Sequence, residues 1–171
     1  MKTLLITILF LLNLSLVAQT ITINEAEAQV TFVFLDEDVE GTMDDFNFTG
    51  QIDLGDLESS VISGSVATKS LDTNNWFRSR HLRSKKYFYA NEHPSLSFTS
   101  TAITGTADSF QVEGTLTIKG ISNTVTWQFT NIENELKGTT SINTQDFKVN
   151  IYEERERNAV DISINLPYDT Q

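Results

Sequence analysis

The sequence predicts an all-β fold, a sandwich or a barrel of roughly eight or nine strands. Apolar and polar residues alternate with a period of two over successive segments, which is the pattern of strands that bury one face. Residues that favour turns separate these segments, as at Gly105 and over 120–123 and 131–134. The pattern contains no repeat and no low-complexity linker. We therefore expect one domain.

The predicted strands follow one another from residue 30 to residue 166. Their inward-facing residues, in chain order, are Val30, Phe32 and Phe34; Phe46, Phe48, Ile52 and Leu54; Leu96 and Phe98; Val112, Leu116 and Ile118; Val125, Trp127 and Phe129; Phe147, Val149 and Ile151; and Val160, Ile162, Ile164 and Leu166. The chain is rich in aromatic residues, with eleven Phe, two Trp and four Tyr, and most lie on the inward face. The interior of a closed eight-stranded sheet is either filled by side chains or open enough for one small ligand. The composition is compatible with both.

The N-terminal residues predict export. A short positive start at Met1–Thr3 precedes an apolar run over 4–12, and the small residue Ala18 follows. This pattern is typical of a secretory signal peptide, so we assign residues 1–18 to the signal and 19–171 to the domain, located in the periplasm or outside the cell. The apolar run is shorter than the roughly twenty residues that a membrane-spanning helix needs. The chain has no cysteine, so burial and hydrogen bonds must hold the fold together.

The chain is acidic, with 23 acidic and 12 basic side chains and a formal net charge of −11. This balance argues against nucleic-acid binding. Half of the basic residues nevertheless fall within 69–88, and they are Lys69, Arg78, Arg80, Arg83, Lys85 and Lys86. Arginines at near-helical spacing could converge on a phosphate or another anion. We expect instead that they pair with the abundant surface carboxylates, as is ordinary on an acidic protein.

The same region interrupts the strand pattern. Between Asp72 and Asn91 the apolar residues are spaced irregularly or helically, which predicts a partly helical crossover between two strands. Asp72 or Thr73 is the expected N-cap of its helical turn. Pro94 favours extended backbone at the residue before it, so an extended segment begins there. A connection of this length usually carries a function or covers a cavity.

Candidates for catalysis and metal binding are few. Asp72, His81 and Ser84 include the residue types of a catalytic triad, but no G-x-S-x-G motif surrounds a serine, so we do not expect an enzyme. Two histidines and no cysteine leave too few ligands for a zinc site. The acidic segment 36–47 looks briefly like a calcium loop, but its last position is Asn47 where a glutamate is required. We expect a solvent-exposed hairpin turn there.

Several motifs occur in an order that resembles the YceI-like family. They are SLDTN at 70–74, RSRHLRS at 78–84, YF at 87–88, HPSLSFTS at 93–100 and GTLTIKG at 114–120, with VEG at 39–41 and Phe46 upstream. The resemblance extends over nearly the whole predicted domain. This chain has Ser79 where the family usually has an acid, and Lys85-Lys86 where the family is often acidic.

The resemblance implies an eight-stranded antiparallel, lipocalin-like β-barrel with an elongated apolar tunnel and the partly helical crossover at about 72–91. It also implies a non-enzymatic carrier or sequestering protein that holds a polyisoprenoid or an isoprenoid-quinone-like amphiphilic lipid, with no other cofactor. The residues expected to contact the lipid are Phe32, Phe34, Phe46, Phe48, Trp76, Leu82, Tyr87, Phe88, Phe98, Leu116, Trp127 and Phe129. Arg78, His81 and Arg83 are the expected contacts of its polar head group.

Two functions from different classes stay open. In the first, the barrel interior holds an amphiphilic lipid as its partner. In the second, the interior is filled, and the domain is a ligand-free structural or protein-interaction module of the cell envelope. An esterase built on Ser84 and His81 is a remote third. The oligomeric state is also open, with a homodimer as one option.

Overall fold

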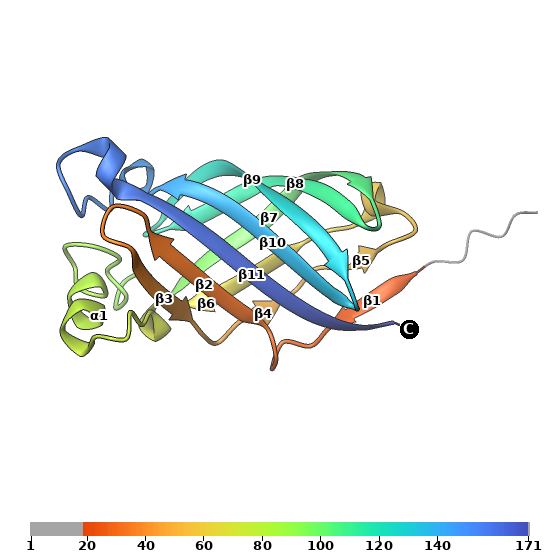
Figure 1. The fold of residues 1–171 in the computed structure, drawn as a ribbon, viewed down its shortest axis with the longest axis horizontal. Helices are drawn as coiled ribbons and strands as arrows, with labels where there is room; N and C mark the ends of the chain where they lie inside the picture. The colour runs from red at the N-terminus through yellow and green to blue at the C-terminus, as the bar shows by residue number, and fades with distance from the viewer. Residues whose placement is uncertain (1–18, 171) are drawn as a thin grey trace, which may run out of the picture.

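The computed structural model describes residues 19–170, so the predicted signal peptide at 1–18 lies outside the described residues. The described chain forms one antiparallel sheet that curls around an apolar interior, with one short helix at one end (Figure 1). The predicted all-β, antiparallel, barrel-like fold is confirmed. Among residues 19–170, no helix is both long and apolar enough to cross a bilayer.

The sheet contains eleven strands within the described part of the chain. They are β1 (Thr20–Ile23), β2 (Gln29–Phe34), β3 (Val39–Met43), β4 (Asn47–Phe48), β5 (Ile52–Asp53), β6 (Ser63–Ala67), β7 (Ser95–Thr106), β8 (Ser109–Ile118), β9 (Ile121–Ile132), β10 (Glu135–Asn143) and β11 (Ala159–Thr170). The connections contain helix α1 (Trp76–Leu82) and the short 3-10 turns η1 (Leu57–Ser59), η2 (Thr68–Ser70), η3 (Thr144–Phe147) and η4 (Arg155–Asn158).

The sheet curls back on itself through one bent stretch of chain. The strand order is β3-β2-β11-β10-β9-β8-β7-β6-β4, and β3 and β4 at its two ends are consecutive in the chain. Between them, Asp45 adopts a left-handed conformation with φ of 54°. The chain there leaves β3, which pairs with β2, and enters β4, which pairs with β6. β5 then pairs with β1, which also pairs with β11. The sequence pattern predicts a single strand over 46–54, where the structure has the two short strands β4 and β5.

One predicted strand is wrong. The alternation of Phe147, Val149 and Ile151 predicts a strand, but β10 ends at Asn143 and the chain continues as η3 and an irregular loop. Lys148, with φ of 55°, turns the chain in the left-handed region. Phe147 and Val149 are buried nonetheless, because they pack in the core at one end of the barrel. Buried and exposed side chains alternate along this loop with a period of two, which is also the period of a strand.

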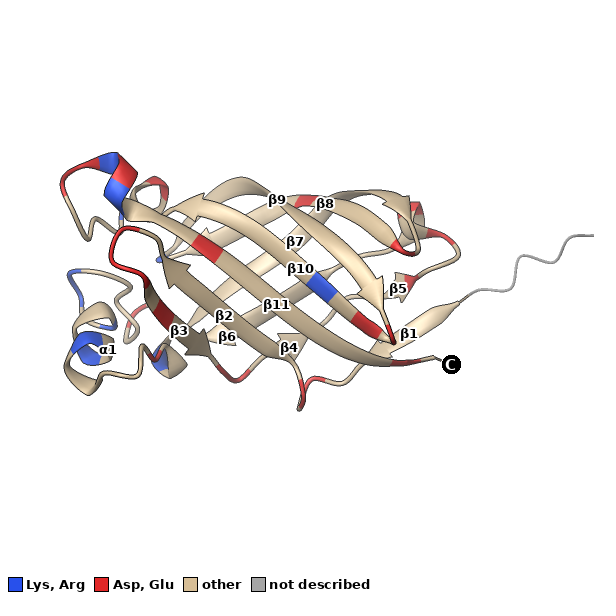
Figure 2. Ribbon diagram, viewed as in Figure 1, with Lys and Arg blue, Asp and Glu red and all other residues tan. Residues whose placement is uncertain are grey.

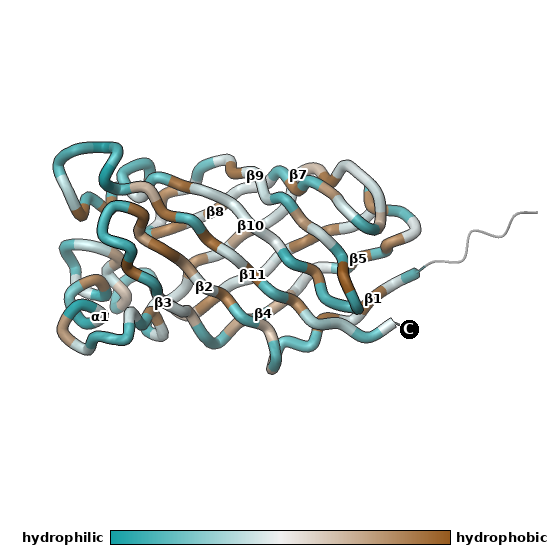
Figure 3. The backbone as a smooth tube through the Cα atoms, viewed as in Figure 1, coloured by the Kyte–Doolittle hydropathy of each residue, from teal (hydrophilic) through white to brown (hydrophobic). Residues whose placement is uncertain are grey.

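The core has two clusters, one toward each end of the barrel. The first includes Ile21 of β1 and Ile52 of β5, and the second includes Leu82 of α1 together with Leu71 and Phe147. In Figure 1, β1 and β5 lie at the opposite end of the barrel from α1. Between the two clusters, apolar and polar residues alternate along the strands, as in β8 (Figure 3). Three partly buried side chains pack against both clusters, namely Phe98, Val125 and Ile162. The interior between the clusters is the part of the fold that can hold a ligand.

Candidate functional site

An apolar cavity lies inside the curled sheet, with lining residues drawn from both core clusters. Its volume is about 130 Å³. Among the described residues, three side chains with a hydroxyl group line it, and they are Ser65, Ser97 and Thr144. Nine of the twelve residues expected to contact a lipid line it, namely Phe32, Phe34, Phe46, Phe48, Phe88, Phe98, Leu116, Trp127 and Phe129.

Glycines in neighbouring strands make room for aromatic rings of this lining. Phe32 pairs with Gly41 across β2 and β3, and Phe129 pairs with Gly138 across β9 and β10. A Cβ atom at Gly41 would lie 2.2 Å from Cζ of Phe32, and one at Gly138 would lie 2.5 Å from Cε1 of Phe129. Each ring therefore lies over its glycine on the barrel wall. Because the rings use this space, they leave part of the interior unfilled.

Trp127 places a polar group in the apolar lining. Its side chain is 7% exposed, and its ring centroid lies 6.1 Å from that of Phe98 and 6.1 Å from that of Phe129. The indole Nε1–H has no hydrogen-bond acceptor within the described residues. A buried donor without a partner costs about 1–3 kcal/mol. Because this nitrogen is buried, an acceptor atom on a ligand could reach it only after the lining moves.

The crossover between β6 and β7 closes one end of the barrel, and we call residues 68–94 the lid. It contains η2 and α1, which confirms the predicted partly helical crossover. Leu71 and Phe88 of the lid line the cavity. Leu82 and Tyr87, also expected lipid contacts, are buried in the core cluster at this end but do not line the cavity.

Trp76 does not line the cavity either, contrary to expectation. It is the first residue of α1, and its side chain is 59% exposed. The buried residues of α1 are Ser79 and Leu82, so the first turn of the helix stays in solvent. The irregular spacing of apolar residues in this region could not show which of them face inward.

A partly buried polar network holds the lid together. Asn75, rather than the predicted Asp72 or Thr73, caps α1, because its Oδ1 accepts a hydrogen bond from the backbone N–H of Arg78 at 3.1 Å. Ser79 Oγ donates to Asp72 Oδ1 at 2.9 Å and accepts from the backbone N–H of Thr73 at 2.9 Å. The pKa of Asp72 lies below its ordinary value, mainly because its carboxylate accepts the hydrogen bond from Ser79.

The three expected head-group residues do not line the cavity. Arg78 Nη2 donates to the carbonyl of Thr73 at 2.7 Å, and Arg83 Nη1 donates to the carbonyl of Lys69 at 2.7 Å. Both guanidinium groups therefore hold lid backbone in place. His81 is exposed on α1. The structure thus brings nine of the twelve apolar candidates together around a cavity, and it keeps the polar candidates outside it.

The catalytic and metal candidates are not assembled. Asp72 accepts from Ser79, and within the described residues no side-chain hydrogen bond joins Asp72, His81 and Ser84. The acidic segment 36–47 contains the turn between β2 and β3, as predicted. Among residues 19–170, no three His, Asp or Glu side chains gather as a metal site would require.

The basic side chains of the lid do not pair with carboxylates, and the pairing prediction is wrong. Every ion pair within residues 19–170 lies elsewhere, on Lys137, Arg155 or Arg157. Three lid cations lie over aromatic rings instead: Arg80 is 5.2 Å from the centroid of Trp76, Lys85 is 5.7 Å from Tyr89, and Lys86 is 5.1 Å from Tyr87. The lid therefore keeps most of its positive charge uncompensated.

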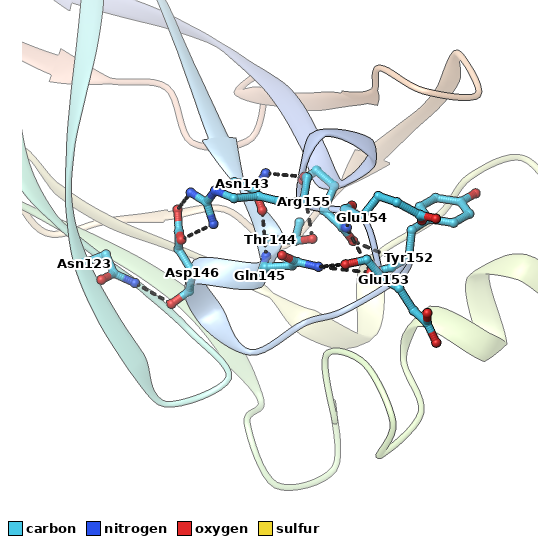
Figure 4. A network of polar contacts seen from close by, with 10 residues as sticks. Asn123, Asn143, Thr144, Gln145, Asp146, Tyr152, Glu153, Glu154 and Arg155 are labelled. Atoms are coloured by element: carbon cyan, nitrogen blue, oxygen red, sulfur yellow. Dashed lines mark hydrogen bonds and ion pairs between the residues drawn. The ribbon is translucent and has the colours of Figure 1, made fainter.

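A second segment, residues 144–158, closes the same end of the barrel, and we call it the brace (Figures 1 and 4). Asn158, its last residue, is fully buried. The side-chain oxygen of Asn158 accepts from the backbone N–H groups of Ile151 and Tyr152, at 2.9 and 3.1 Å. Its Nδ2 donates to the carbonyls of Tyr152 and Glu154, at 3.0 and 2.7 Å. One side chain thus satisfies four backbone groups of the loop.

Charged groups hold the brace together and connect it to its neighbours. Arg155 makes two contacts with the carboxylate of Asp146, at 2.6 and 2.9 Å, and this contact lowers the pKa of Asp146 (Figure 4). Lys119 Nζ, in the turn between β8 and β9, donates to the carbonyl of Lys86 in the lid and to that of Lys148 in the brace. Sequence reasoning missed the brace, because its alternating apolar residues predict a strand.

Comparison with known proteins identifies the family. The model of the YceI-like domain matches residues 21–168. The chain belongs to the YceI-like family. This match confirms the resemblance that the sequence motifs indicate. Curated relatives of this YceI-like chain include a UPF0312 protein of Pectobacterium atrosepticum, 32% identical over 85 residues, and Protein YceI of Salmonella arizonae, 33% identical over 86 residues. Each match covers 50% of this chain and 44% or 45% of the relative, so the matched region spans less than half of those proteins.

Solved structures of low sequence identity share the fold. BcnA of Burkholderia cenocepacia superposes with a TM-score of 0.77 at 24% identity, over 85% of this YceI-like chain and 98% of BcnA. A polyisoprenoid-binding domain from Saccharophagus degradans superposes with a TM-score of 0.63 at 13% identity, over 90% of this chain and 99% of that domain. These similarities show that the curled antiparallel sheet is the fold of the family.

Proposed function

We propose that this YceI-like domain binds an amphiphilic lipid of isoprenoid type, a polyisoprenoid or an isoprenoid quinone, and acts as a carrier or sequestering protein. The observation that carries the proposal is the cavity, whose lining is apolar and largely aromatic. Burial of hydrocarbon against such a lining contributes about 25 cal/mol per Å² before the costs of association. The polyisoprenoid-binding domain with the same fold supports the choice of ligand class.

The size of the cavity sets a condition on the proposal. Its volume of about 130 Å³ is similar to that of an engineered apolar cavity that holds one benzene-sized molecule, roughly 150 Å³. A chain of several isoprene units therefore requires the lining to move. Phe46, Phe48 and Phe98 are only partly buried, and Phe46 follows the bend at Asp45 outside any strand. These rings are the part of the lining that we expect to give way.

The unpaired indole of Trp127 favours a ligand with a hydrogen-bond acceptor. A quinone carbonyl or an alcohol oxygen near Nε1 would restore the hydrogen bond that the folded protein lacks. A plain hydrocarbon chain would not. We therefore expect a quinone to bind more tightly than a hydrocarbon of the same length.

The proposal is tested by lipid binding to the purified mature chain. Native mass spectrometry should detect one lipid per protein after purification from a bacterial envelope, and added isoprenoid quinone should raise the melting temperature. A ligand at one hundred times its Kd stabilises the folded state by about 2.7 kcal/mol. Absence of both a bound lipid and a thermal shift would contradict the carrier function and favour the ligand-free envelope module.

Export forms a separate part of the proposal. We propose that residues 1–18 direct the chain out of the cytoplasm and are removed after Ala18. The intact mass of the protein recovered from a periplasmic fraction should equal that of residues 19–171. A mass that includes the first residues, or recovery only from the cytoplasm, would contradict it.

A further inference from the structure

Two adjacent aromatic side chains on the lid are exposed. Trp76 is 59% exposed and Phe77 is 78% exposed, and their ring centroids lie 4.8 Å apart. They stand at the start of α1, at one end of the molecule (Figure 1). The other large exposed apolar side chains of the described residues are Leu35, Val61 and Ile132, which occur one at a time. An exposed aromatic pair usually marks an interaction site.

Basic side chains surround this pair. Figure 2 shows the positive residues of the lid gathered around α1, whereas acidic residues dominate most of the remaining strands and turns. Six of the twelve basic residues of the chain lie in the lid, and none of them forms an ion pair within residues 19–170. Arg80 lies over the ring of Trp76, so charge and aromatic surface are presented together.

The acidic turn between β2 and β3 lies at the same end of the barrel but is partly neutralised. Arg157 of the brace contacts Asp36 at 2.8 Å and Glu37 at 3.9 Å. Tyr152 also hydrogen-bonds to Glu37. Asp36 and Glu37 are therefore engaged with the brace. The lid cations form no ion pair within residues 19–170, although the charge of Arg83 does act on Asp72. An anionic surface could approach the lid from the α1 side.

We propose that the lid is a docking surface for a bilayer with anionic head groups. Trp and Phe insert their rings at the boundary between head groups and acyl chains, and each Lys or Arg near an anionic surface adds about 1 kcal/mol. The aromatic pair supplies the rings that insert, and the unpaired lysines supply the electrostatic attraction. A seven-residue helix is a small contact for a protein partner, since stable protein interfaces bury roughly 1,200–2,000 Å². The observations therefore favour a membrane surface over a protein.

Docking in this way would bring the cavity to the bilayer. Leu71 and Phe88 of the same lid line the cavity. The end of the barrel that the lid closes would therefore face the membrane. This consequence rests on the proposed lipid-carrier function. The docking itself does not, because it is measured with vesicles and the mature chain alone.

The two tryptophans make the docking directly visible. Trp76 is exposed and Trp127 is buried, so a vesicle that engages the lid should shift and quench the fluorescence of Trp76 alone. Vesicles of phosphatidylcholine mixed equally with phosphatidylglycerol should bind and shift the emission to shorter wavelength, and brominated acyl chains should quench it. Vesicles of phosphatidylcholine alone should bind at least tenfold more weakly. The Trp76→Phe protein should still bind but show no shift.

Paired variants separate the two contributions. Trp76→Ser combined with Phe77→Ser should reduce binding to the anionic vesicles by roughly tenfold or more. Lys85→Glu combined with Lys86→Glu should reduce it by a similar factor and remove most of its dependence on salt. Ile132→Ser is the matched control, because Ile132 is 51% exposed and ends β9 at the other end of the barrel (Figure 1). It should bind as the parent does.

Three outcomes would overturn the proposal: no binding to either vesicle, equal binding to both, or binding that the lid variants leave unchanged. In the first case the patch would instead be assigned to an acidic protein. The melting-temperature test with added quinone is independent of these results. Failure of vesicle binding therefore leaves the cavity proposal standing, and failure of quinone binding leaves the docking proposal standing.

Discussion

The lid and the brace close the same end of the barrel in different ways. The brace is held by Asn158, whose side chain bonds to four backbone groups, and its cations Arg155 and Arg157 are paired with carboxylates. The lid places its exposed aromatic rings and unpaired cations in solvent. A segment whose polar groups are satisfied internally stabilises the fold, whereas one that leaves rings and charges free is available for interaction. The difference assigns stability to the brace and contact with partners to the lid.

The largest expected effect is on the brace. Asn158→Ala removes a fully buried side chain that is the partner of four backbone groups, so the free energy of unfolding should fall by about 3 kcal/mol in urea denaturation. Asn123→Ala is the control, because Asn123 is half-buried and makes one hydrogen bond, to the carbonyl of Asp146. It should cost less than about 1 kcal/mol. Equal effects of the two variants would contradict the role assigned to the brace.

A change in the barrel wall should affect the cavity without touching either segment. Gly138→Ala puts a Cβ 2.5 Å from the ring of Phe129, which must move into the cavity. We expect a loss of about 1–3 kcal/mol in stability and loss of the thermal shift caused by quinone. Thr139→Ala, on the next residue of β10 and exposed, is the control and should retain the shift. A Gly138→Ala protein that binds quinone normally would show that the cavity is not the site.

Removal of the polar contact under the lid should have a smaller effect than removal of Asn158. Ser79→Ala deletes the hydrogen bond to Asp72 and the partner of the Thr73 N–H, and we expect a loss of about 1–2 kcal/mol. The pKa of Asp72 should rise toward its ordinary value in an NMR titration. Because that pKa is lowered in the folded parent, its stabilisation is present above the unfolded pKa and lost as the pH falls. Ser79→Ala should lose this component of the pH dependence, and an unchanged Asp72 titration would contradict the assignment.

The brace should also respond to alkaline pH. The carboxylate of Glu37 raises the pKa of Tyr152 to about 12, mainly through a hydrogen bond with the tyrosine hydroxyl. The neutral hydroxyl is favoured in the folded state, so this stabilisation is present below the ordinary pKa and lost as the pH rises through about 12. A titration of tyrosinate absorbance should contain a component near that pH which Tyr152→Phe removes. Persistence of the component in the variant would assign it to another tyrosine.

The smallest expected effect on stability is in the exposed part of the lid. Trp76→Ser combined with Phe77→Ser should change the free energy of unfolding by less than about 0.5 kcal/mol, because both side chains face solvent. Urea denaturation of the parent and the double variant measures this change in the free energy of unfolding. A loss similar to that of Asn158→Ala would show that the aromatic pair has a structural role, and the contrast between the two segments would disappear.

Much of the cavity could be predicted from the sequence, because a strand places alternate side chains on one face. Period-two alternation identified Phe32, Phe98 and Phe129 as inward-facing without knowledge of their neighbours. The same reasoning failed where the chain leaves the sheet. Phe147 and Val149 alternate in a loop, and Trp76 begins a helix whose orientation depends on what Ser79 and Leu82 contact. Local period carries no information on such contacts.

The sequence by itself determined the all-β class, the inward face of most strands and the family to which the chain belongs, because these follow from local alternation and short motifs. The tertiary structure decided how much of the interior stays open and which charges remain free. The cavity depends on rings that lie over glycines of adjacent strands, such as Phe129 over Gly138. The free charge of the lid depends on which carboxylates lie within reach of its cations. Both are relations between residues on different elements, which only the folded chain brings together.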